Sequence, residues 1–176
     1  MAKIVQKEAK VLREVAKEVS LNEITSSKFQ KIIMKMKKSL AKEKDGVALA
    51  APQIGQAVRI FVISKNLPIL EAIEKEEKGV KPLPADLIFI NPVITKKSRE
   101  QKLITEGCLS VRWWYGEVKR STKATVKAYN EKGECFTLGA AGLLAQAFQH
   151  EIDHLDGVLF IDKAENLAEV KPEKND

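Results

Sequence analysis

Residues 149–157 read Gln149-His150-Glu151-Ile152-Asp153-His154-Leu155-Asp156-Gly157 and contain two histidines four positions apart. On an α-helix, positions i and i+4 lie about 40° apart on one face, so both imidazoles can reach the same metal ion. Glu151 lies beside that ion, in the pattern of a metal site whose carboxylate handles protons. The segment therefore predicts a metal-binding helix, although two unrelated histidines on a surface helix would give the same letters.

The neighbouring residues support a helix here. Leu144, Phe148, Ile152 and Leu155 recur at helical spacing and predict a buried face. Gly157 can adopt the left-handed conformation that ends a helix. The chain has only two histidines, and both lie in this segment, which favours the metal site over a chance arrangement.

The composition indicates one compact domain, residues 1–176, with 44% hydrophobic and 31% charged residues. The sequence has no run of about 18 apolar residues, so no membrane span is expected. Its charged start shows no secretory signal. Two cysteines are too few for a disulfide framework, and a metal-binding thiolate needs a reducing compartment, so we expect a cytoplasmic location.

The net charge of +6 would favour attraction to nucleic acid through its phosphates. However, acidic residues are interleaved with the basic ones throughout, and no nucleic-acid motif is present. A mixed, solvated surface is the simpler interpretation. We therefore expect no specific nucleic-acid partner and no membrane partner.

Further segments have a recognisable period. An amphipathic helix is expected from residue 26 to about residue 44, where apolar residues recur every three or four positions. Strands are expected at residues 59–63, 87–94 and 123–129, with residues 134–138 returning as the hairpin partner of the last.

Two other segments carry much charge. Residues 67–85 contain a cluster of glutamates and lysines with two prolines and predict a solvated insertion. Residues 163–176 are also rich in charge and predict a frayed tail. Neither segment is expected to mark a domain boundary.

A catalytic metal site takes three protein ligands and keeps one position open, so a third ligand must come from elsewhere. The metalloprotease pattern HExxHxxGxxH is excluded because its last position is Phe160. A second metalloprotease class takes a glutamate about one helix further on, but after His154 only the charged tail offers glutamates, which argues against it. Cysteine is the remaining strong ligand. Cys108 lies in an extended run where Gly107 leaves room for an ion, whereas Cys135 lies inside a hairpin strand and is interpreted as a small core residue. The residues therefore favour Cys108.

Three segments together resemble the signature motifs of the peptide deformylase family, in the family's order and at similar intervals. They are residues 46–53, Glu106-Gly107-Cys108-Leu109-Ser110 and residues 149–154. The resemblance implies an α+β fold in which antiparallel strands surround a central helix carrying HExxH. It implies a metal-dependent hydrolase that removes the N-formyl group from N-formylmethionine of newly synthesised polypeptides and releases formate. The expected partners are N-formylmethionyl nascent peptides, with transient ribosome association as a further expectation.

The resemblance also assigns roles by position. Cys108, His150 and His154 would hold the metal, and Glu151 would transfer the proton. Gln53 and the backbone N–H of Leu109 would face the oxyanion, although the residues alone allow Gln53 to be a satisfied amide in a tight loop. The family typically uses Fe²⁺ and works with Zn²⁺, Ni²⁺ or Co²⁺. One divalent ion, Fe²⁺ first, is therefore the expected cofactor, because the donor set by itself suits several borderline metals.

The chain departs from the family pattern at two places near the site. Ala48 stands where the first motif usually has glycine, and its methyl group would crowd a substrate backbone. Residues 112–115, Arg-Trp-Trp-Tyr, stand where the family often has proline and glycine. We expect Gly46, Ala48, Trp113 and Trp114 to contact the substrate, while the aromatic run could instead cover the core.

Two other functions stay open on the sequence. One is a metallopeptidase or amidase that acts on another N-acyl substrate with the same site. The other is a basic ribosome-associated binding protein with a structural metal, against which the intact Glu151 and Gln53 argue because a structural site needs neither. Arg120 could pair with Asp153 or Glu106 and so support the site.

Overall fold

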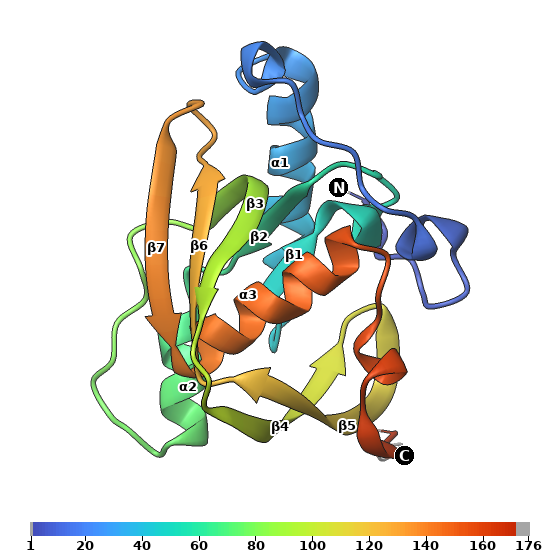
Figure 1. Cartoon of the computed structure of the whole chain (residues 1–176), viewed down its shortest axis with the longest axis vertical. Coiled ribbons are helices and arrows are strands. Elements are labelled where there is room, and N and C mark those ends of the chain that lie inside the picture. Colours follow the sequence, from blue (N-terminus) through green and yellow to red (C-terminus); the bar gives the residue numbers. More distant parts are fainter. Residues whose placement is uncertain (1, 172–176) are drawn as a thin grey trace.

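Residues 2–171 form two β-sheets and three α-helices (Figure 1). The computed structural model describes residues 2–171, apart from the side chain of Glu74. The strands are β1 (Ala48–Ala50), β2 (Ile60–Ile63), β3 (Leu87–Lys97), β4 (Gln101–Cys108), β5 (Val111–Ser121), β6 (Lys123–Tyr129), β7 (Cys135–Ala141) and β8 (Glu165–Glu169). The helices are α1 (Ser27–Leu40), α2 (Leu67–Glu74) and α3 (Gly142–Leu155).

The strands form a five-stranded sheet in the order β1-β2-β3-β6-β7 and a three-stranded sheet in the order β4-β5-β8. Neighbouring strands in both sheets run antiparallel. The expected α+β class with antiparallel strands is therefore confirmed, as are the first amphipathic helix and the expected strands, with ends shifted by a few residues.

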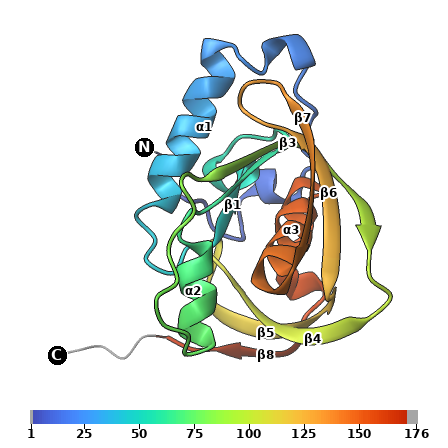
Figure 2. The same cartoon turned by 90° about the vertical axis from the view of Figure 1, so that its left-hand side faces the viewer.

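The five-stranded sheet is covered on both faces, by α1 on one side and α3 on the other (Figure 2). Strand β2 shows why. Ile60 and Val62 pack into the cluster under α1, while Phe61 and Ile63 pack into the cluster under α3. Successive side chains of a strand point to opposite faces, so a strand buried on both sides needs a continuous apolar run.

Helix α3 connects the two sheets and so fixes where its histidines lie. Phe148 packs against Phe61 and Phe89 of the large sheet, with ring centroids 6.2 and 5.1 Å apart. The Gln149 side chain accepts a hydrogen bond from the Ser121 N–H and donates one to the Ser121 carbonyl, both at 3.0 Å, as a neighbouring strand would. Ser121 ends β5, so the helix is anchored to both sheets immediately before His150.

Three expectations are wrong in part. The segment expected as a solvated insertion begins with helix α2, whose Leu67 and Ala72 are buried. The segment expected as a frayed tail forms β8, which pairs with β5; residues 172–176 of that tail lie outside the described residues. Cys135, expected in the core, is exposed on β7.

Candidate metal centre and active site

The three predicted metal ligands come from two distant parts of the chain and meet. Cys108 ends β4, and His150 and His154 lie one turn apart on α3. One donor atom from each lies within 4.8 Å of the others, and the Cys108 Sγ is 3.2 Å from the His154 Nε2. One sulfur and two imidazole nitrogens therefore converge on a common point. The His154 side chain is buried, with 1% of its surface exposed.

The orientation of the His150 ring is set by Glu106. The His150 Nδ1 lies 3.0 Å from the Glu106 Oε2. This hydrogen bond fixes the tautomer and leaves Nε2 available as a metal ligand, the usual carboxylate–histidine–metal arrangement. Burial would raise the pKa of Glu106, but hydrogen bonds from Arg120 and His150 outweigh it and lower the pKa to about 2. Glu106 is therefore ionised and holds the ring as an acceptor.

Arg120 links strand β4 to helix α3 through hydrogen bonds to a carboxylate on each. Its guanidinium donates two hydrogen bonds to Glu106, at 2.7 and 2.9 Å, and one to Asp153 on α3, at 2.6 Å. Asp153 also accepts a bond from Lys163 at 2.7 Å. The sequence left Arg120 to pair with one carboxylate or the other, and the structure shows both pairs.

Gln53 lies at the centre of a buried polar group. Its Oε1 accepts a hydrogen bond from the Ala50 N–H at 2.8 Å, which fixes the direction of the amide. Its Nε2 points toward the Ser110 Oγ at 3.2 Å and the Cys108 Sγ at 3.5 Å. The amide N–H₂ is thus directed at Cys108, one of the converging ligands, and at Ser110. Leu109, between these two residues in the chain, is partly buried.

Glu151 is 3% exposed and faces the same space. Among residues 2–171, neither its Oε2 nor the His154 Nδ1 has a hydrogen-bond partner. Burial raises the pKa of Glu151 to about 7, so this carboxylate can gain or lose a proton near neutral pH. Burial also lowers the pKa of His154, which favours the neutral imidazole that binds metals.

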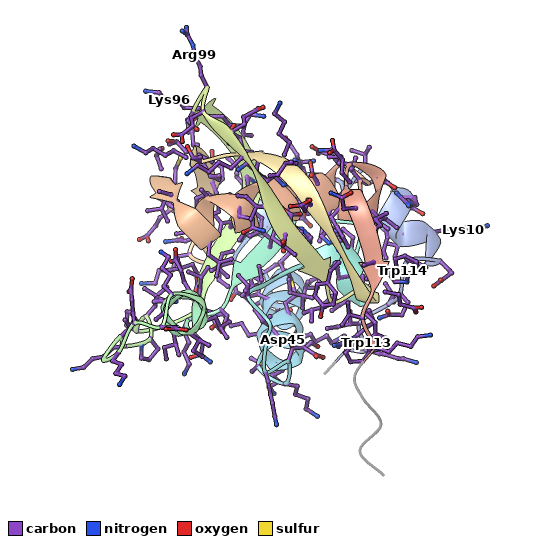
Figure 3. The ribbon with its side chains drawn as sticks, turned by 90° about the horizontal axis from the view of Figure 1, so that it is seen from below. Lys10, Asp45, Lys96, Arg99, Trp113 and Trp114 are labelled. Atoms are coloured by element: carbon purple, nitrogen blue, oxygen red, sulfur yellow. The ribbon has the colours of Figure 1, made fainter. Side chains whose placement is uncertain are left out.

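These polar side chains lie at a cleft of about 740 Å³ between the two sheets. Its lining includes the polar residues of the site, namely Gln53, Cys108, His150 and Glu151, and also Ala48, Trp113 and Trp114. Figure 3 shows Asp45 and Trp113, both cleft residues, on the same side of the molecule. Of the predicted substrate contacts, Gly46 is not brought to the lining: it is buried, and a Cβ there would meet Leu40 and Glu43.

The aromatic run lines the cleft, and part of it also packs on the core. Trp113 is 40% exposed and has a φ of 69°, in the left-handed region where glycine is favoured. Trp114 lines the cleft and also packs on the cluster around Val118 and Phe160. Gly107 lies under Tyr115, because a Cβ at Gly107 would come within 2.7 Å of that ring.

Comparison with known proteins identifies the family. The family model described as polypeptide deformylase matches residues 1–170. The chain belongs to the peptide deformylase family. It is 41% identical over 169 residues to the peptide deformylase of Carboxydothermus hydrogenoformans, covering 94% of this chain and 95% of that protein.

Solved peptide deformylases have the same fold. The crystal structure of the peptide deformylase from Thermotoga maritima superposes with a TM-score of 0.77 at 34% identity, over 94% of this chain and 98% of that one. The Met-Ala-Ser-bound class I type b peptide deformylase from Acinetobacter baumannii gives a TM-score of 0.80 at 28% identity, over 93% and 98%.

The donor set of this peptide deformylase family member fits a divalent metal. A cysteine and two histidines converge at a partly buried point, and within the described residues the group has these three members and no fourth. A three-ligand thiolate–imidazole set leaves room for a non-protein ligand, as catalytic sites require.

One polar residue of the site, Ser110, is not predicted from the sequence; its hydroxyl accepts a hydrogen bond from the Gln53 side-chain amide. Ser110 lies two residues after Cys108 in the same motif, and this position is the feature of the sequence that indicates a place near the site.

Proposed function

We propose that the protein is a peptide deformylase that removes the formyl group from N-formylmethionine of newly synthesised polypeptides and releases formate. The observation that carries this is the convergence of Cys108, His150 and His154 beside the buried, unpaired carboxylate oxygen of Glu151. Membership of the family and the Met-Ala-Ser peptide bound to the related Acinetobacter baumannii enzyme support the substrate.

Cys108, His150 and His154 would hold one divalent ion, with Fe²⁺ the first candidate and Zn²⁺, Ni²⁺ or Co²⁺ the alternatives. Such an ion supplies Lewis acidity, which acidifies water and polarises a carbonyl oxygen. Glu106 keeps His150 oriented for this role through its hydrogen bond to Nδ1. The site thereby combines a fixed donor set with an open side toward the cleft.

Glu151 is the group that moves the proton. Its carboxylate would accept a proton from the attacking water and deliver it to the amine that leaves when the amide bond breaks. A group with a pKa of about 7 can do both near neutral pH, and burial of Glu151 provides that value. The unpaired Oε2 is free to make the required hydrogen bond to a water molecule.

Negative charge develops on the formyl oxygen as water attacks. The Gln53 Nε2, already aimed at Cys108, and the backbone N–H of Leu109 would donate hydrogen bonds to it. Donors fixed before the reaction need no reorganisation, and removing one typically costs about 3 kcal/mol of transition-state stabilisation. The Ala50 N–H is the contact that fixes the Gln53 amide in advance.

The cleft walls would hold the rest of the peptide. We assign Ala48, Trp113 and Trp114 to substrate contact, whereas Gly46 allows the wall to pack closely against the end of α1. Residues 1–176 would act as one catalytic domain in the cytoplasm, meeting nascent chains through transient contact with the ribosome. No helix among residues 2–171 has the length and apolar character to cross a membrane.

Removing the metal tests the proposed function directly. We expect dialysis against a chelator to lower formate release from formyl-Met-Ala-Ser by at least about a hundredfold, because Lewis acidity contributes several kcal/mol. Adding Ni²⁺ or Co²⁺, or Fe²⁺ under anaerobic conditions, should restore formate release. Cleavage of unblocked peptides in place of formate release would establish the metallopeptidase alternative. Ribosome binding without any hydrolysis would establish the structural-metal alternative.

Replacing Trp113 tests the substrate wall. We expect Trp113→Gly to raise KM for formyl-Met-Ala-Ser about fivefold with kcat nearly unchanged, because an aromatic contact contributes about 1 kcal/mol to binding. Glycine is the matched replacement, since it adopts the φ of 69° without strain. Steady-state kinetics measure both constants, and an unchanged KM would show that Trp113 makes no contact with the substrate.

A further inference from the structure

The N-terminal segment runs beside the catalytic residues, although the proposed function gives it no role. The Val5 N–H donates a hydrogen bond to the backbone carbonyl of Gln53 at 2.9 Å. The next residue, Gln6, donates from its side-chain Nε2 to the carbonyl of Leu109 at 3.1 Å. Two consecutive residues therefore hold the backbones of the two residues assigned to stabilise the oxyanion.

This segment is itself firmly attached. At its start, the Ser39 hydroxyl on α1 donates to the Ala2 carbonyl at 2.8 Å. Ile4 is buried in the core cluster under α1. Further along, the Val19 N–H and carbonyl bond to the Asn91 side chain at 2.8 and 2.7 Å. Val5 and Gln6 thus belong to a segment whose backbone is fixed on both sides of them.

The turn after Cys108 is held by contacts within its own motif, by the pairing of Cys108 with Val111 and by the bond from Gln6. The Ser110 N–H lies 3.4 Å from the Cys108 Sγ, and the Ser110 hydroxyl accepts the Gln53 amide. These contacts bind the turn on the side of the metal ligands. The Gln6 bond to the Leu109 carbonyl is a contact from outside the motifs and limits rotation of the Leu109 backbone.

We propose that Val5 and Gln6 form a clamp that sets the distance and direction between the Gln53 amide and the Leu109 N–H, with Gln6 as a positioning residue for catalysis. This inference rests on the proposed function and on the roles given there to Gln53 and Leu109. A displacement of about 1 Å at such donors can cost about a hundredfold in rate. Gln6 therefore acts on kcat through Leu109, without touching the substrate.

Gln6→Met is the test, because methionine keeps the length of the side chain and removes the donor. We expect kcat for formyl-Met-Ala-Ser to fall about tenfold, with KM changed less than about twofold. The absorption spectrum of the Co²⁺-substituted protein should stay the same, because Cys108, His150 and His154 are untouched. Backbone hydrogen exchange should become faster at Ser110, because its N–H belongs to the same peptide group as the Leu109 carbonyl that Gln6 holds.

Gln30→Met is the matched control. The Gln30 Nε2 also donates to backbone carbonyls, of Ile24 at 3.0 Å and Glu131 at 2.9 Å, and is likewise part-buried. Its loss should lower thermal stability about as much as the loss of Gln6, with no change in kcat. If Gln6→Met does not fold, Gln6→Asn, which keeps the amide but is one methylene too short to reach Leu109, should show the same kcat loss.

The outcomes separate the two proposals. Equal kcat in the unmodified protein and the Gln6 variants overturns the clamp and leaves the proposed function standing. A tenfold loss in both Gln6→Met and Gln30→Met also overturns it, because the effect would then follow general stability. Absence of formate release by the unmodified, metal-loaded protein overturns the proposed function and the clamp with it.

Discussion

Glu151→Gln is expected to lower kcat for deformylation about a thousandfold while the protein keeps its metal. The amide has the same shape as the carboxylate but cannot accept a proton from water, and general acid–base catalysis typically contributes about 10²–10⁴-fold. Glu151 does not belong to the converging group of ligand atoms, so metal content should not change. Formate release and metal analysis on the same preparation measure both quantities.

Glu117→Gln is a suitable control for Glu151→Gln. Glu117 lies on β5 and accepts a hydrogen bond from Asn166 at 2.7 Å, away from the cleft lining. The Glu117→Gln variant should have the same kcat as the unmodified protein. If Glu151→Gln retains more than about a tenth of the activity with full metal content, then Glu151 does not perform the proton transfer assigned to it.

Arg120→Met is expected to lower the free energy of unfolding by about 3–5 kcal/mol, because it leaves an ionised carboxylate buried without its partner. Arg120 is 5% exposed and Glu106 is 3% exposed, so little water can replace the lost bonds. Denaturant unfolding of the metal-free protein measures the loss without a contribution from metal binding. Weaker metal binding should accompany it, since Glu106 orients His150.

Arg13→Met provides the matched comparison. Arg13 pairs with Asp162, but their side chains are 45% and 36% exposed, and such surface pairs contribute about 0–1 kcal/mol. Adding Glu106→Gln to Arg120→Met should recover part of the lost stability, because it removes the uncompensated charge. A loss for Arg120→Met no larger than that for Arg13→Met would contradict the assigned role of the buried pair.

The parts of the fold that follow from local pattern were predictable. The apolar positions of α1 and α3 recur at helical spacing, and the alternation in β6 marks its buried face. The convergence of Cys108 with the histidines was also expected, but on the grounds of ligand chemistry and family resemblance, since periodicity does not bring β4 to α3. The roles of the site residues stay predictions that the experiments above address.

Other elements depend on contacts distant in sequence. Strand β8 is exposed along its whole length, so it has no burial period, and only pairing with β5 defines it. Helix α2 is not predicted by the sequence because its short apolar stretch runs directly into the charged residues that follow. Cys135 lies on the same face of β7 as Thr137 and Gly139, whereas Phe136 and Leu138 point to the core. The two-residue period of the strand therefore places Cys135 on the outside.

The position of α3 has a consequence for how the molecule is made. Synthesis proceeds from the N-terminus, so both sheets except β8 leave the ribosome before the helix that lies between them is complete. Until then Phe61 and Phe89 lack Phe148, their partner in the core. A chain that stalls before about residue 155 would display these apolar surfaces and be prone to aggregate. Completion of α3 is therefore expected to be the step that allows this protein to acquire its native core.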